Sequence, residues 1–120
     1  GCGRIFEGTA HQMYDSLQLL KNLPKATKVY CAHEYTEQNL EFALMVEPKN
    51  SDLQARYAHV KKLRSENEIT VPSNIDIEIK TNPFLRCDED DIKNLIFEKY
   101  DINGDNPTTF KAVREWKDSF

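Results

Sequence analysis

One short stretch of this sequence, Thr27–Ala32, has the composition of a buried β-strand, and it limits the possible folds more than any other feature. The stretch reads TKVYCA, and its β-branched and aromatic residues are typical of a short, largely buried strand. A single strand is not stable by itself, so it must pair with others. Strand and helix alternate only once along the chain, so this stretch is a small piece of α/β structure joined to a mostly helical unit.

Most of the remaining sequence has the spacing of helices, and everything after residue 35 is predominantly helical by this pattern. The first helix follows Thr9, which forms a capping box with Gln12, and it ends before Pro24. We expect Thr36 to cap the second helix, and Asn50 or Ser51 to cap the third. The predicted helices after residue 35 begin near Thr36, Ser51, Asp88 and Pro107 and end near Glu47, Arg64, Tyr100 and Phe120.

The stretch Ile69–Leu85 fits neither pattern well. Isoleucines at every second position from 75 to 79 alternate with charged residues, which is the period of a strand. Pro72 and the Asn82-Pro83 pair bracket this alternation closely, and no partner strand is apparent nearby. We therefore predict an extended or irregular conformation for this stretch.

The composition limits the classes of function. With 30% charged and 39% hydrophobic residues in a chain of 120, the sequence is typical of a globular protein with one domain or two small pieces. The net charge of −4 and the pI near 5.4 argue against general binding to nucleic acid or to an anionic membrane. No run of about 18 apolar residues is present, so we expect no membrane span.

The cysteines and the first residues bear on location. Cys2, Cys31 and Cys87 form no C-x-x-C pair and are odd in number. This favours reduced thiols and a cytoplasmic location over a disulfide framework. The chain begins Gly1-Cys2-Gly3 without a methionine, which we interpret as part of a longer protein. A mitochondrial location stays open, because a presequence would lie upstream.

His33 is the first candidate functional residue. It directly follows the predicted strand, and α/β enzymes place ligands and catalytic groups at such strand ends. An ordinary histidine at a turn is the alternative, since most histidines are simple surface or core residues. One imidazole cannot hold a catalytic zinc ion, which takes about three protein ligands. His11 and His59 lie in predicted helices, where we interpret them as ordinary residues.

Two cations near the C-terminus form a second candidate site. Arg114 and Lys117 are three residues apart on the last predicted helix, so both can point to one side. Arginine offers a bidentate fork for a carboxylate, and lysine offers a mobile point charge. A solvated helix face without a ligand is the alternative. The loop Gly1–Gly8 contains G-x-G but lacks the third glycine of a dinucleotide-binding motif, so it is only a weak indication of a phosphate site.

These patterns alone do not indicate a reaction, but five blocks of the sequence together resemble glyoxalase II, the hydroxyacylglutathione hydrolases. The blocks occur in the family's order and cover nearly the whole chain: GCGRIFEGTAHQMYDSL, VYCAHEYTEQNLEFALMVEP, TVPS, NPFLR and TTFKAVREWKDSF. The resemblance implies a mainly α fold. Residues 1–34 would be the last helix and strand of a metallo-β-lactamase-like αββα domain, and residues 35–120 a helical glutathione-thioester-binding domain. Between TVPS and NPFLR the family has a short helix or turn, against the extended conformation predicted above.

The resemblance also implies an activity. Family members hydrolyse S-D-lactoylglutathione to glutathione and D-lactate, which completes the detoxification of methylglyoxal. A binuclear zinc centre, with iron or manganese as alternatives, activates the attacking water. His33 matches the last histidine ligand of that centre, and the other ligands would lie upstream of Gly1. We therefore expect the 120 residues alone to be inactive as a hydrolase.

Further residues match positions that hold the glutathione moiety in the family, where fixed cations suit its glycine carboxylate. The matching residues are Arg4, Phe6, Tyr35, Arg114 and Lys117. Phe6 stands where the family often has tyrosine, and the missing hydroxyl removes one hydrogen bond to substrate, worth about 1 kcal/mol. Ala32 stands where glycine is usual, which adds a methyl group beside His33.

Two alternatives to a part of a hydrolase stay open. The first is a non-catalytic helical module that binds glutathione or another small anion without turnover. The second is a fragment that only folds, wholly or in part, and self-associates through its exposed strand edge. We expect no nucleic-acid or membrane partner in any of these cases, and we expect the intact enzyme to be a monomer.

Overall fold

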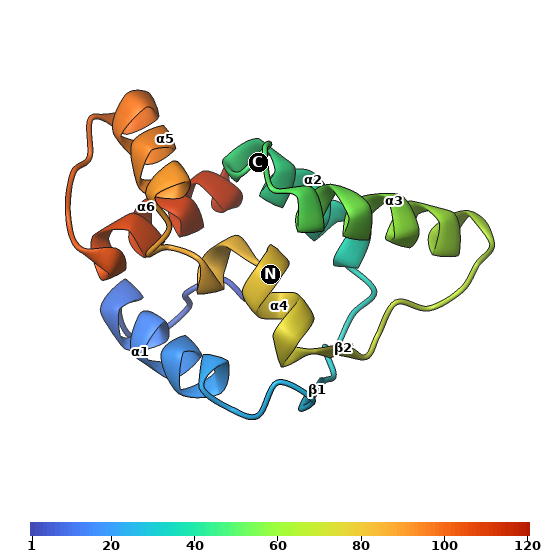
Figure 1. The fold of residues 1–120 in the computed structure, drawn as a ribbon. Coiled ribbons are helices and arrows are strands. Elements are labelled where there is room, and N and C mark those ends of the chain that lie inside the picture. Colours follow the sequence, from blue (N-terminus) through green and yellow to red (C-terminus); the bar gives the residue numbers. More distant parts are fainter.

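The computed structural model describes all 120 residues and consists mainly of α-helices (Figure 1). This architecture confirms the mainly α fold class predicted from the sequence. In chain order the elements are α1 (Ala10–Lys21), β1 (Lys28–Val29), α2 (Thr36–Val46), α3 (Ser51–Ser65), β2 (Ser73–Asn74), α4 (Ile75–Thr81), the 3₁₀ helix η1 (Pro83–Leu85), α5 (Asp90–Tyr100) and α6 (Asn106–Asp118). No helix is both long enough and apolar enough to cross a membrane.

Side-chain caps fix where the helices begin. At the start of α1, Thr9 Oγ1 accepts from Gln12 N at 3.1 Å, and Gln12 Oε1 accepts from Thr9 N at 2.9 Å. These two bonds confirm the predicted capping box. Asn50 caps α3 by accepting from the main-chain N–H of its first turn. The cap predicted for α2 is wrong by one residue, since Thr36 is its first helical residue and Tyr35 precedes it without a side-chain bond.

The predicted strand is shorter and more exposed than the sequence suggested. β1 covers only Lys28–Val29, and it pairs antiparallel with the equally short β2. The prediction of a largely buried strand over Thr27–Ala32 is therefore wrong in length and burial within this chain, as Tyr30 is 69% exposed. The ladder stops after two residues because the chain beyond Asn74 turns directly into α4.

The alternating isoleucines form a helix, α4, so the extended conformation predicted for them is wrong. Asn74 starts this helix, since its side chain accepts from Ile77 N at 2.8 Å. Ile75 and Ile79 are four residues apart and share one helix face, so an alternating pattern also suits one short helix. Ile75 is buried. The short helix implied by the family resemblance is confirmed.

The main hydrophobic core joins α2, α5, α6 and η1. Phe84 of η1 lies between Phe42 of α2 and Phe110 of α6, with ring centroids 6.1 and 5.8 Å apart, and all three rings are buried. Half-buried side chains of α1 pack against this core from outside. The packing places the last turns of α6 beside the start of α2, where the candidate site lies.

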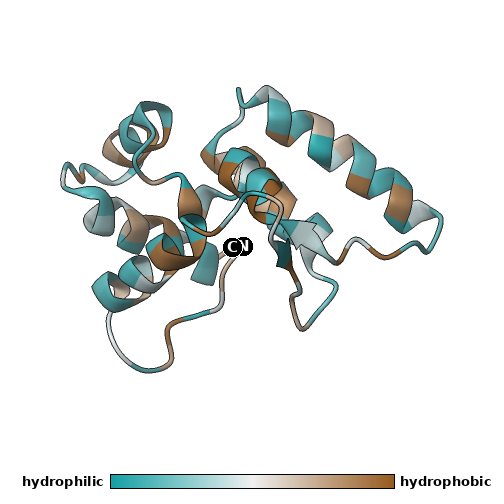
Figure 2. Ribbon diagram, turned by 60° about the horizontal axis from the view of Figure 1, so that its bottom comes forward, coloured by the Kyte–Doolittle hydropathy of each residue, from teal (hydrophilic) through white to brown (hydrophobic).

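A second, smaller cluster joins α2 to α3. It consists of Leu40 and Ala43 from α2 and Leu53 and Val60 from α3. In Figure 1, α3 lies on the far side of α2 from α5 and α6. Figure 2 shows that α3 is hydrophilic over most of its length. This helix is therefore held by few buried side chains.

Candidate functional site

An open cavity lies where the N-terminal loop, the turn after β1, the start of α2 and the end of α6 meet. Its volume of about 660 Å³ is typical of a small-molecule pocket. We call it the α2–α6 cavity. Most of the residues predicted from the sequence as site residues line it, namely Arg4, His33, Tyr35, Arg114 and Lys117. The remaining one, Phe6, is not among its lining residues and is 89% exposed.

Arg114 holds the N-terminal loop against α6. Its side chain is buried, and Nη1 donates to Cys2 O at 2.7 Å and to Gly3 O at 3.2 Å. Nη2 donates to Asp118 Oδ1 at 3.0 Å, and the guanidinium lies 4.9 Å from the centroid of the Phe84 ring. Nε is buried without a hydrogen-bond partner. Arg114 is thus far from a solvated face, and most of its donors are used within the chain.

Lys117 differs from Arg114 in having no polar partner. It is half-buried, and its Nζ lies 5.7 Å from the centroid of Phe42 and 5.6 Å from that of Phe120. Burial lowers the pKa of the Lys117 ammonium, and the neighbouring charges of Arg114 and Arg4 lower it further. An anion bound beside this ammonium would offset its desolvation.

Arg4 contributes the third cation of the α2–α6 cavity. Its Nε lies 3.8 Å from Asp118 Oδ1, the same oxygen that accepts from Arg114. Asp118 therefore lies between two guanidinium groups and offsets part of their mutual repulsion. The cavity still has more positive than negative charge, because its one nearby acid faces three cations.

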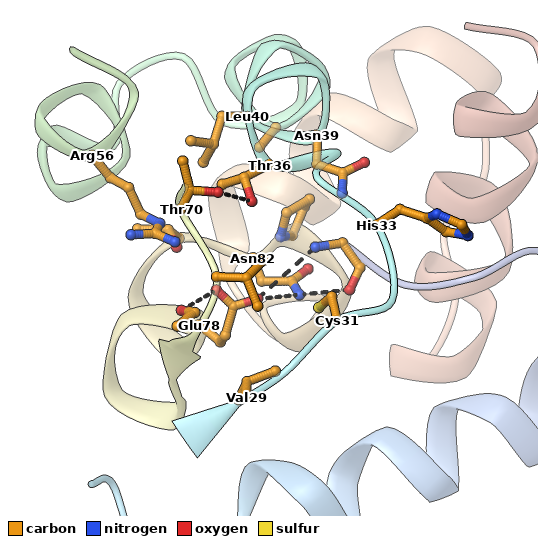
Figure 3. A pocket seen from close by; sticks show the side chains of 16 residues that line it. Val29, Cys31, His33, Thr36, Asn39, Leu40, Arg56, Thr70, Glu78 and Asn82 are labelled. Carbon is orange, nitrogen blue, oxygen red and sulfur yellow. Dashed lines mark hydrogen bonds and ion pairs between the residues drawn. The ribbon is translucent and has the colours of Figure 1, made fainter. Parts of the chain in front are cut away.

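His33 and Tyr35 line the cavity from the turn between β1 and α2. Their rings stack with centroids 4.9 Å apart and an interplanar angle of 22°. Both side chains are exposed. A smaller cavity of about 50 Å³ borders this turn, and in Figure 3 the His33 side chain points away from Thr36 and Thr70, which face each other.

Glu34, between these two aromatic residues, points to a different part of the chain. Its Oε1 accepts from Thr70 N at 2.6 Å and its Oε2 from Thr70 Oγ1 at 2.7 Å. Partial burial acts to raise the pKa of the Glu34 carboxyl, but the bonds from Thr70 and the charge of Arg64 outweigh it, so the pKa lies below its ordinary value. Glu34 therefore ties the His33 turn to the segment before β2.

The two cysteines that are wholly or partly buried, Cys2 and Cys87, are poor nucleophiles. Cys2 lines the α2–α6 cavity together with the exposed Cys31. Burial raises the pKa of the Cys2 thiol, and the hydrogen bond from Arg114 only partly opposes this. Burial also raises the pKa of Cys87 to about 12. Both thiols are therefore protonated at neutral pH, and a thiol is a poor nucleophile. All three cysteines are free.

The metal-ligating residues of this chain do not gather in one place. Nowhere do three or more His, Cys, Asp or Glu side chains come together in a way that could hold a metal ion. His33 offers one exposed imidazole, whereas a catalytic zinc site takes about three protein ligands. These 120 residues by themselves do not fit a metal centre, so a metal at His33 would need ligands from outside them.

Comparison with known proteins identifies the family. A family model described as hydroxyacylglutathione hydrolase C-terminus matches residues 34–120. The chain belongs to this family. The glyoxalase II resemblance predicted from the sequence blocks is thereby confirmed. The hydroxyacylglutathione hydrolase C-terminus comprises α2 to α6 of the present structure, with the α2–α6 cavity at its edge.

Curated proteins named hydroxyacylglutathione hydrolase are similar along the whole chain. The protein of Pseudomonas syringae pv. syringae (strain B728a) is 51% identical over 100% of this chain and 47% of its own length. Those of Aliivibrio salmonicida (strain LFI1238) and Nostoc punctiforme (strain ATCC 29133 / PCC 73102) are 50% and 48% identical, again over 100% of this chain, and the match covers 47% and 45% of their lengths. The chain therefore spans about half the length of the curated relatives it matches.

Sequence reasoning missed two features near the cavity, the charge of Asp118 and the bond between Glu34 and Thr70. Asp118 is four residues after Arg114 on the same helix, so the rule for neighbouring charges on a helix could have found it. The bond between Glu34 and Thr70 joins residues 36 positions apart, and no local pattern signals it. The roles of the predicted ligand-binding residues stay predictions.

Proposed function

We propose that this chain is the substrate-binding part of a metal-dependent thioester hydrolase. The substrate would be an S-2-hydroxyacylglutathione, above all S-D-lactoylglutathione, and the products glutathione and D-lactate, in the removal of methylglyoxal. The observation that carries this proposal is the unpaired ammonium of Lys117, half-buried in a cavity of small-molecule size beside Arg4 and Arg114. Such a site favours a small, flexible anion with a carboxylate at one end.

The side chains of the cavity suggest a division of work. Lys117 pairs with the glycine carboxylate of the glutathione moiety, and Arg4 adds positive charge beside it. Arg114 keeps the N-terminal loop, and with it Arg4, in position. Tyr35, which also lines the cavity and stacks on His33, contacts the peptide so that the thioester lies near His33. Holding the substrate in one orientation lowers the entropic part of the barrier.

His33 would supply one ligand to a metal centre, with zinc as the expected ion and iron or manganese as alternatives. The remaining ligands would come from residues outside this chain, in line with relatives about twice as long. The ion would supply Lewis-acid activation of water and of the thioester carbonyl. We expect the present 120 residues to bind substrate without turnover when separated from those ligands.

A binding module without turnover is the second candidate, favoured by the lack of a metal-ligand cluster within these residues. Thioester hydrolysis with added zinc separates the two candidates when measured on this chain and on the full-length gene product that contains it. Hydrolysis by the full-length protein alone supports the hydrolase. If neither protein hydrolyses the thioester while both bind glutathione, the module is correct.

The binding site itself is tested by calorimetry with S-methylglutathione, a thioether that cannot be hydrolysed. Lys117→Ala in the full-length gene product should lower the affinity at least about tenfold, because a charge-assisted bond to a carboxylate is lost. Lys111→Ala is the matched control, since Lys111 lies on the same helix with an exposed side chain and pairs only with Glu115. Equal affinity of wild type and Lys117→Ala would contradict the proposed site.

A further inference from the structure

Glu34 lies in the turn that carries the predicted metal ligand, between His33 and Tyr35. From its contacts we infer that Glu34 is a positioning residue, which holds His33 and Tyr35 toward the α2–α6 cavity by fixing their turn to Thr70. This role deepens the proposed function and rests on it.

Both oxygens of the Glu34 carboxylate accept from the same residue. Thr70 N donates to Oε1 at 2.6 Å and Thr70 Oγ1 donates to Oε2 at 2.7 Å. Arg64 Nη1 lies 4.0 Å from Oε1 and adds a weaker attraction. Two short bonds to one carboxylate fix both its position and its orientation.

Thr36 completes the link on the other side of the turn. Its Oγ1 lies 2.6 Å from Thr70 Oγ1, and Figure 3 marks this contact. Because the single hydroxyl proton of Thr70 goes to Glu34, the Thr36 hydroxyl is the donor in this second bond. Thr70 is itself buried, so it offers a fixed point to which residues 34 and 36 are both tied.

The two functional side chains have no comparable support of their own. His33 and Tyr35 are exposed, and their ring contact is with each other. The turn between β1 and α2 has no regular structure, and Tyr35 precedes α2 without a side-chain cap. The main chain at Glu34 therefore sets the directions of both rings, with Glu34 pointing to Thr70 while its neighbours line the cavity.

The chemistry of residue 34 allows a sharp comparison of variants. Alanine removes both acceptors and leaves Thr70 N–H without a partner. Glutamine keeps an acceptor for Thr70 N–H, and its amide can donate to Thr70 Oγ1 once that hydroxyl turns toward Thr36. Glu34→Gln should therefore preserve the anchor that Glu34→Ala destroys. Thr70→Val removes the hydroxyl but keeps the main-chain donor, and should give an intermediate effect.

The experiment uses the full-length gene product and has two readouts. The first is the amide ¹⁵N order parameter of His33 and Tyr35, measured well below the thermal midpoint of each variant. We expect it to fall in Glu34→Ala from about 0.85 to about 0.6 or below, and to stay high in Glu34→Gln. Glu37→Ala is the control, because Glu37 lies in the adjacent first turn of α2 and makes no side-chain hydrogen bond or ion pair.

The second readout is the kinetics of thioester hydrolysis at the same temperature. Glu34→Ala should lower kcat/KM between about tenfold and a hundredfold. The reason is that a small displacement of His33 and Tyr35 would hold the thioester in a less reactive orientation. Glu34→Gln should stay within about threefold of wild type. If Glu34→Ala does not fold, Thr70→Val provides the same comparison with a smaller expected loss.

The outcomes separate this inference from the proposed function. A Glu34→Ala protein with a lower thermal midpoint but wild-type order parameters and kinetics would overturn the positioning role. Glu34→Gln as impaired as Glu34→Ala in both readouts would also overturn it, since the anchor would then not be the cause. Wild-type protein that neither binds S-methylglutathione nor hydrolyses the thioester would refute the proposed function, while the order parameters would still report on the anchor.

Discussion

Arg114 and Lys117 are three residues apart on one helix, yet their surroundings differ. The arginine donates hydrogen bonds to two carbonyls of the N-terminal loop and to Asp118. The lysine has only aromatic rings as partners. A planar fork with several donors can hold several acceptors at once, whereas an ammonium on a flexible stem suits a ligand that comes and goes. We therefore assign stability mainly to Arg114 and ligand binding mainly to Lys117.

Arg114→Lys should destabilise the fold, although it conserves the charge. A single ammonium cannot reach the Cys2 and Gly3 carbonyls and Asp118 together, so a cation at this buried position loses some of its acceptors. We expect a loss of about 2 kcal/mol in the free energy of unfolding, measured by urea denaturation. The exposed Lys111→Arg on the same helix serves as the control and should leave the midpoint unchanged. An equal midpoint for Arg114→Lys would mean that these bonds contribute nothing net.

The lowered pKa of Lys117 gives ligand binding a pH dependence. Burial, Arg114 and Arg4 all disfavour the charged form, so the ammonium loses its proton at a lower pH than an ordinary lysine. The charge that attracts the carboxylate is present below this pKa and is lost as the pH rises through it. Affinity for S-methylglutathione should therefore fall with rising pH, and the fall should begin below the ordinary lysine pKa of about 10.4.

Lys117→Arg is the control for this pH effect, because a guanidinium stays charged throughout the range. Titration of the amino group of the ligand affects wild type and variant alike, so it cancels in the ratio of their affinities. The ratio should change with pH. A constant ratio from about pH 7 to pH 10 would show that Lys117 does not titrate there.

At the scale of elements, one ion pair joins the end of α2 to the segment after η1. Arg86 Nε and Nη2 donate to the two oxygens of Glu47 at 2.8 and 2.7 Å, and Nη1 donates to Ile79 O of α4 at 3.1 Å. Glu47 is buried. Arg86→Met should cost about 3 kcal/mol in the free energy of unfolding, because it leaves a buried carboxylate unpaired.

Two further variants test that explanation. The double change Glu47→Leu with Arg86→Met should recover much of the loss, since no buried charge then remains. Lys80→Met removes an exposed ion pair with Asp76 of similar length, 2.9 Å, and should leave the urea midpoint unchanged. A similar loss for Arg86→Met and Lys80→Met would show that burial is not what makes the Glu47 pair important.

Elements with a local signal were predictable from the sequence. The capping box at Thr9 and the cap at Asn50 determine the starts of α1 and α3 through contacts only three residues long. α4 was mispredicted because two isoleucines four residues apart fit a strand and a short helix equally well, and burial against the rest of the chain decides between them. The length of β1 was overestimated, because a strand extends only as far as its partner pairs with it. The partner strand β2 pairs with only two residues of β1.

In the candidate site, too, local spacing was predictable from the sequence and long-range contacts were not. The spacing of Arg114 and Lys117 predicted that both would face one side, and both line the α2–α6 cavity. The bonds that hold Arg114 to Cys2 and Gly3 cross more than 100 positions, so they could not be derived from spacing. Neither could the anchoring of Glu34 by Thr70. These long-range contacts form only when the helices have packed.

At the scale of the whole molecule, the two hydrophobic clusters divide the structure unequally. The main cluster contains ten buried residues and draws on α2, α5, α6 and η1, whereas the cluster under α3 contains four. A helix held by few buried side chains opens at a lower free energy than the global one. We therefore expect α3 to open while α5 and α6 stay folded.

Native-state hydrogen exchange tests this expectation with two matched variants, because Val60 in α3 and Val113 in α6 are both fully buried. Val60→Ala should speed exchange of the α3 amides about tenfold or more and leave the slowest amides of α6 nearly unchanged, since its lost packing weakens only the smaller cluster. Val113→Ala should speed the slowest amides everywhere, because it weakens the main cluster. Equal acceleration of α3 and α6 by Val60→Ala would mean that the chain unfolds as one unit.

Opening of α3 would also loosen Thr70, which follows α3 in the chain and holds Glu34. The stability of α3 and the order of the His33 turn should therefore change together.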